Sequence, residues 1–139
     1  MKLLLIVLAL AGVLVSSLAL QVHYATGAEP CDINAHWDCG IVNHSSYSVI
    51  DGVPVAAIGI AGYLLLALLV IVERRVLVLG AAIVALAFAI HLSMIEKNVL
   101  LVWCLYCVLS QGIIALFTIL SGLWLAMSRT RKKSAVPVA

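Results

Sequence analysis

Long apolar stretches, separated by polar segments, make up most of this 139-residue chain. Runs of about 18 or more apolar residues are typical of helices that cross a bilayer. The pattern predicts four such helices, at residues 3–24, 53–72, 76–95 and 99–127. We therefore expect an all-α membrane protein, a four-transmembrane-helix bundle that forms one integral membrane domain over residues 1–139.

The connections between the predicted helices differ in length. Residues 25–52, between the first and second helices, form a long polar segment. The later connections are short, Glu73-Arg74-Arg75 and Glu96-Lys97-Asn98. Because functional residues are often carried by long loops on a rigid scaffold, we expect the chemistry of this bundle to involve the 25–52 loop.

Composition supports a membrane protein, since 65% of the residues are hydrophobic and only 10% are charged. Soluble domains are about 45–50% apolar and about 25% charged. The first apolar run also carries small residues at 16–19, a feature of cleavable signal peptides. That run is longer than the apolar core of a signal peptide, which has about 7–15 residues, so we expect an uncleaved helix.

Charge placement predicts the orientation of the bundle, because cytoplasmic loops of membrane proteins carry an excess of Lys and Arg. Apart from Lys97, the basic residues all fall on one side of the four predicted helices: Lys2, Arg74, Arg75, Arg129, Arg131, Lys132 and Lys133. Most acidic residues fall on the other side: Glu29, Asp32, Asp38, Asp51 and Glu96. We expect an integral inner (cytoplasmic) membrane protein with both termini in the cytoplasm and the long loop on the periplasmic or exterior side.

The chain has four cysteines, in two pairs on that exterior side, where disulfides form and persist. Cys31 and Cys39 lie in the long loop, whereas Cys104 and Cys107 form a CxxC in the first turns of the fourth predicted helix. The partial positive charge of a helix N-terminus favours thiolate, and this spacing puts both sulfurs on one helical face. Two dithiols at one membrane face suit the passage of electron pairs from an aqueous partner to a lipid-soluble acceptor.

Two other interpretations of the cysteines remain. Both pairs could be inert structural disulfides, although a CxxC closes too short a loop to stabilise a fold much. A zinc or iron–sulfur site could use the cysteines together with His36 and His44. The spacings do not match a zinc ribbon and an oxidising exterior disfavours a thiolate cluster, so we expect no metal.

Taken together, these residues resemble the vitamin K epoxide reductase (VKOR) family, and its bacterial members most closely. The resemblance covers nearly the whole chain and depends on a set of elements in a fixed order: the loop pair Cys31 and Cys39, Ser45, the run Gly52-Val53-Pro54, and the membrane-edge pair Cys104 and Cys107. In DsbB-type quinone reductases the two cysteine pairs occur in the reverse order.

The resemblance implies a catalytic relay through all four cysteines. Cys31 would form a mixed disulfide with a DsbA-like thioredoxin-fold protein, Cys39 would attack Cys104, and Cys107 would then reduce a membrane quinone, ubiquinone or menaquinone. Thiol–disulfide exchange of this kind requires accessible sulfurs and a mobile loop. Since the chain ends in a short basic tail, we expect the thioredoxin-fold partner to be a separate protein.

The resemblance also suggests three residues that contact the quinone. Ser45 matches a family serine near the quinone, although it could equally cap a helix or turn. Gln111 stands where well-known members have a tyrosine, and Asp51 is the nearest counterpart of a family asparagine. The function expected is disulfide generation by a thiol:quinone oxidoreductase. The alternatives are reduction of quinone or quinone epoxide for quinone recycling, and a non-enzymatic membrane scaffold with structural disulfides.

Overall fold

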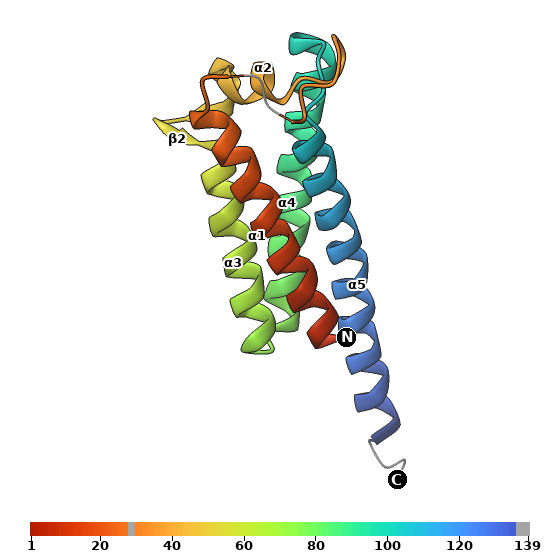
Figure 1. Cartoon of the computed structure of the whole chain (residues 1–139). Coiled ribbons are helices and arrows are strands. Elements are labelled where there is room, and N and C mark those ends of the chain that lie inside the picture. Colours follow the sequence, from red (N-terminus) through yellow and green to blue (C-terminus); the bar gives the residue numbers. More distant parts are fainter. Residues whose placement is uncertain (28–29, 136–139) are drawn as a thin grey trace.

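The structure is a computed structural model that describes residues 1–27 and 30–135. Its long helices are α1 (Lys2–Tyr24), α3 (Val55–Ile71), α4 (Arg75–Ile95) and α5 (Leu105–Ala135), which run side by side as a bundle (Figure 1). Within the described residues, three helical segments are long and apolar enough to cross a membrane, namely α1, α5, and α4 with its extension to Leu100. The all-α membrane fold is therefore confirmed, while crossing by the 17-residue α3 stays a prediction.

The core of the bundle is narrow, and most of the apolar surface faces outward. Leu5, Val70, Val78 and Phe117 are fully buried where α1 packs against α3 and α5, and α4 packs against α5. Large apolar side chains are exposed along all four long helices. A soluble protein would avoid so much exposed apolar surface, whereas lipid chains solvate it readily.

The second predicted helix starts later than expected because a hairpin precedes it. Strand β1 (Val49–Ile50) pairs antiparallel with β2 (Val53–Pro54). The two residues between them have positive φ, 51° at Asp51 and 80° at Gly52. Asp-Gly is a favoured pair for such a two-residue turn, since both positions must adopt φ above zero. The expected start at residue 53 therefore becomes Val55.

The link expected at Glu96-Lys97-Asn98 is wrong, since these residues continue α4 as a short π-helix, η2 (Glu96–Leu100). The polar residues suggested a chain break, but the Glu96 side chain turns into the protein and is buried. The chain changes direction after them, at Leu101, whose φ is 56°. Helix α5 accordingly begins at Leu105 instead of 99, and it continues past 127 to Ala135 because its basic residues are good helix formers.

The loop expected at 25–52 contains regular structure in its described part. Helix α2 (Cys39–His44) and a 3₁₀ turn, η1 (Ser46–Ser48), precede the hairpin. This segment lies over the end of the bundle that is opposite to the start of α1 and the end of α5 (Figure 1). At the other end, Lys2 forms an ion pair with Glu73 at 2.9 Å. Cysteines and most basic residues are thus at opposite ends of the bundle; Glu29 lies outside the described residues.

Close packing of α1 on α3 depends on Gly12. A Cβ atom at this position would lie 2.3–2.5 Å from ring carbons of Tyr63. The Tyr63 ring cannot easily move away, because it is buried and its hydroxyl donates to the Ser110 carbonyl oxygen on α5 at 2.8 Å. One glycine therefore sets the distance between two helices, as small residues commonly do in membranes.

We predict that Gly12→Ala destabilises the bundle by about 1–3 kcal/mol, the usual range for overpacking a well-packed core. The measurement is the thermal unfolding midpoint in detergent. The matched control is Gly112→Ala, since a Cβ at Gly112 would meet no atom within 4 Å. A midpoint for Gly12→Ala at or above that of the control would contradict this account of the α1–α3 contact.

Candidate active site

The four cysteines gather at the covered end of the bundle in two different states. Cys31 and Cys39 form a disulfide with a Cα–Cα distance of 5.8 Å, whereas Cys104 and Cys107 are free thiols. Cys31, Cys39 and Cys104 belong to one buried cluster, against which Cys107 packs. Both predicted pairs are thus brought together in space. In the described residues, no three His, Cys, Asp or Glu side chains group as metal ligands would.

Backbone pairing holds the loop cysteines beside the CxxC. The Trp103 N–H donates to the His36 carbonyl oxygen at 2.8 Å, and the Asp38 N–H donates to the Trp103 carbonyl oxygen at 3.0 Å. The residues that directly precede Cys39 and Cys104 are therefore paired with each other. The rings of Trp37 and Trp103 lie 6.5 Å apart at the same bridge.

Helix α2 begins at Cys39, and its first turn is fixed by two aspartates. Asp38 accepts a hydrogen bond from the Ile41 N–H at 2.9 Å, as an N-cap residue does. Asp32 Oδ1 accepts from the Gly40 N–H at 3.1 Å. Cys39 is thereby held at the N-terminus of α2.

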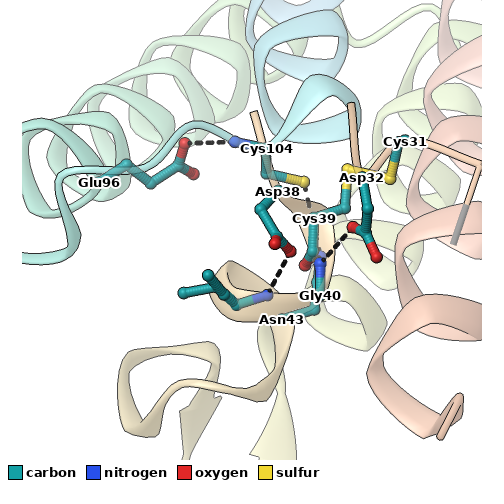
Figure 2. The surroundings of a disulfide bond; sticks show 9 residues. Cys31, Asp32, Asp38, Cys39, Gly40, Asn43, Glu96 and Cys104 are labelled. Atoms are coloured by element: carbon teal, nitrogen blue, oxygen red, sulfur yellow. Dashed lines mark hydrogen bonds between the residues drawn. A yellow bond between two sulfur atoms is a disulfide. The ribbon is translucent and has the colours of Figure 1, made fainter. Parts of the chain in front are cut away.

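Cys104 lies between polar groups on two sides (Figure 2). Asn43 Nδ2, on α2, donates to the Cys39 carbonyl oxygen at 2.9 Å and lies 3.5 Å from Cys104 Sγ. Glu96 Oε2 accepts from the Cys104 N–H at 3.2 Å, and the Glu96 carboxyl group also interacts with the Cys107 thiol. Asn43 is 6% exposed and Glu96 is 3% exposed, so water barely reaches either contact.

The free thiols are not equivalent. A hydrogen bond from the Cys107 thiol lowers the pKa of Cys104, and this is the largest effect on it. Burial raises the pKa of Cys104, but the net result is a pKa below the usual value. Cys104 directly precedes α5, and Cys107 lies one turn further along it. Cys104 therefore has the character of the thiolate that exchanges with a disulfide, and Cys107 that of its proton-bearing partner.

A cavity of about 590 Å³ opens beside Cys107. It lies mainly between α3 and α4, which pack more sparsely against each other than α3 does against α1. Its walls are mostly apolar, and small residues leave room in them: Ala56, Gly59, Gly62, Gly80, Ala81, Ala85 and Ala89. Polar groups reach it near the cysteines, from Asn43, Ser45, Glu96 and Ser110. The volume is within the range of small-molecule sites, about 300–1,000 Å³.

The other predicted quinone contacts lie in different positions relative to this cavity. Ser45 lines it, and its hydroxyl also donates to the Val42 carbonyl oxygen at 2.7 Å at the end of α2. Gln111 is hydrogen-bonded to Ser93 of α4 and is not among the lining residues. Asp51 forms the exposed hairpin turn and is not among them either. Ser45 thus caps the end of α2 and lines the cavity, while its contact with a quinone stays a prediction.

Sequence reasoning missed Asn43 and Glu96, which contact Cys104. Asn43 follows Cys39 by four residues, so on a helix the two share a face. That signal was present, but a six-residue helix within a polar loop was not expected. Glu96 was assigned to a polar link, although an ionisable residue at the edge of an apolar run is itself a sign of function in membrane proteins.

We predict that Cys107→Ala moves alkylation of Cys104 to higher pH, because the hydrogen bond that lowers the pKa of Cys104 is lost while burial remains. The measurement is the pH profile of iodoacetamide labelling in detergent, read by mass spectrometry of the Cys104 peptide. Cys107→Ser keeps a hydroxyl donor and should shift the profile less. An unchanged profile in Cys107→Ala would exclude this origin of the shift.

No curated protein matches the chain. Residues 3–122 match the vitamin K epoxide reductase family, and this match includes all four cysteines, the cavity-lining helices and the segment that covers them. Members of this family are membrane oxidoreductases that act through cysteines. The chain therefore belongs to the vitamin K epoxide reductase family.

Proposed function

We propose that this protein is a disulfide-generating thiol:quinone oxidoreductase of the inner membrane. The observation that carries the proposal is the position of the CxxC between two different environments. Cys104 lies in the buried cluster of the loop disulfide, whereas Cys107 lines the apolar cavity. An electron pair that reaches Cys104 from the loop could therefore leave through Cys107 toward a molecule in the cavity.

The proposed cycle begins when a reduced DsbA-like protein attacks Cys31 and frees Cys39. Cys39 then attacks a Cys104–Cys107 disulfide, forming the Cys39–Cys104 bond and releasing Cys107. Once the partner's second thiol has released Cys31, Cys31 attacks Cys39 and frees Cys104. The products are an oxidised partner, the Cys31–Cys39 disulfide and a reduced CxxC, which is the combination present in the structure.

Quinone reduction completes the cycle. The dithiol gives up an electron pair and two protons, the Cys104–Cys107 bond re-forms, and quinone becomes hydroquinone. The cavity suits a quinone because its mostly apolar walls match the ring and isoprenoid tail, while Glu96 and Ser110 are among the polar groups that line it together with Cys107. Ubiquinone and menaquinone both fit this description.

Access to the partner requires the covering segment to move. Cys31 is only 2% exposed and Cys39 is fully buried. The contacts that hold the segment at Trp103 are a few hydrogen bonds, each contributing about 0.5–1.5 kcal/mol. Opening must also expose the buried cluster that Cys31, Cys39 and Val42 form with Val22 and Val102. With the basic end of the bundle in the cytoplasm, the opened segment faces the periplasm.

We predict that the reduced protein in detergent loses one dithiol for each short-tailed ubiquinone or menaquinone analogue that it reduces. Cys107→Ala should abolish the reaction, because no disulfide can then form at the CxxC. Cys31→Ala is the matched control: it should still reduce quinone when dithiothreitol reduces the CxxC directly, but not when a thioredoxin-fold protein is the donor. Wild-type thiols that remain unchanged by quinone would refute the proposal.

We also predict that Cys31→Ser accumulates a Cys39–Cys104 disulfide. Cys39 is unpaired in this variant and can attack Cys104, but the thiol that normally releases Cys104 is absent. Mass spectrometry of non-reduced peptides measures the bond, and the double variant Cys31→Ser with Cys39→Ser is the control. If the peptides contain only a Cys104–Cys107 bond, the proposed order of transfer is wrong.

A further inference from the structure

Glu96 is the one charged side chain that is buried among the residues that the structure describes. Burial of a carboxylate at the membrane edge is unfavourable unless partners compensate it, so such residues usually serve a function. The exposed glutamate at the other end, Glu73, has an ion pair with Lys2 instead. Glu96 has no such ion pair among the described residues, so the burial of its carboxyl group calls for a functional explanation.

Three features converge on the Glu96 carboxyl group. Oε2 accepts a hydrogen bond from the Cys104 N–H at 3.2 Å. The same group interacts with the thiol of Cys107. It also lines the cavity that Cys107 lines. Glu96 thus touches a reacting sulfur and borders the space in which the electron acceptor would be bound.

Quinone reduction at this position needs a carrier of protons. Hydroquinone formation takes up two protons along with the electron pair, and the cavity walls are mostly apolar. Cys107 must lose its proton before its sulfur can act as a nucleophile or electron donor. Among the cavity-lining groups, the carboxyl group of Glu96 is the one that both contacts Cys107 and exchanges protons readily.

We propose that Glu96 is a catalytic residue that takes the proton from the Cys107 thiol and delivers it to the reduced quinone, an inference that rests on the proposed function. The Cys107 S–H bond breaks and an O–H bond forms on Glu96. The S–S bond to Cys104 then forms, and the electron pair passes to the quinone. Glu96 returns its proton to one quinone oxygen, while the proton of Cys104 reaches the other oxygen through solvent.

A purely structural role for Glu96 is the alternative, since its Oε2 contact holds the Cys104 backbone at the start of α5. Glu96→Gln separates the two roles. Glutamine keeps an oxygen that can accept the Cys104 hydrogen bond, but it cannot take up a proton. Glu96→Asp keeps an acid on a shorter side chain. Glu73→Gln removes a carboxylate from the far end of the bundle and is the matched control.

The test is single-turnover oxidation of the dithiothreitol-reduced protein by a short-tailed ubiquinone analogue in detergent, over a range of pH. We expect Glu96→Gln to slow this step by about 100-fold or more, the range of general acid–base catalysis, with loss of the wild-type pH dependence. Glu96→Asp should retain part of the rate, and its pH profile should keep the wild-type shape. Glu73→Gln should behave as wild type.

A second measurement covers the case in which Glu96→Gln folds poorly. The thermal midpoint of each variant reports whether it is folded. If Glu96→Gln is not folded, the test is whether Glu96→Asp keeps the shape of the wild-type pH profile. Wild-type rate and pH dependence in folded Glu96→Gln would overturn the role of Glu96 and leave the proposed function standing. If wild-type protein does not reduce the quinone at any pH, the proposed function fails, and this inference fails with it.

Discussion

The backbone pairing between the loop and Trp103 is the interaction on which the site depends. Two hydrogen bonds join the strand-like residues before Cys39 to those before Cys104, although the two cysteines are far apart in sequence. This bridge adds to the burial of Cys31 and Cys39 against Val22 and Val102 in holding the covering segment over the bundle. In the proposed cycle, holding Cys39 beside Cys104 makes their exchange an internal step, which is much faster than an encounter between separate groups. Because the bridge is short, it also allows the segment to open.

Loose packing between α3 and α4 is the second constraint, and it follows from the membrane environment. In water, an apolar cavity of this size would strongly favour collapse of the helices around it. In lipid, helix association depends mainly on close contact, and the small residues on α1 and α3 provide it at Gly12 and Gly59. Gly59 also lines the cavity, as do Gly62 of α3 and the small residues of α4, Gly80, Ala81, Ala85 and Ala89. The same residue types therefore bring one pair of helices together and leave space beside another.

Sequence reasoning predicted the features that come from composition and spacing. The apolar runs predicted the first and last residues of α1, α3 and α4 to within a few residues. The two cysteine pairs lie at one end of the bundle, as their positions in the sequence predicted. The contacts of single polar side chains were not predictable in the same way. Glu96 looked like part of a link because polarity alone does not tell whether a side chain points to water or to a buried N–H group. Gln111 was suggested because it stands where well-known members of the family have a tyrosine, and its hydrogen bond to Ser93 on a neighbouring helix could not be predicted from that position.

Cys104 and Cys107 have different surroundings because they are separated by one helical turn. Cys104 lies just before α5, where it meets Asn43 and the loop cluster, and Cys107 lies inside the helix, where it meets the cavity and Glu96. In the proposed cycle these two positions need different properties. The sulfur that exchanges with the loop should be a good leaving group, which agrees with the lowered pKa of Cys104. The sulfur that faces the cavity should hold its proton until an acceptor is bound, because a thiolate without a partner is unstable in an apolar space. A carboxylate beside Cys107 that can take this proton, and release it again, would allow electrons to leave the dithiol only when quinone is in place.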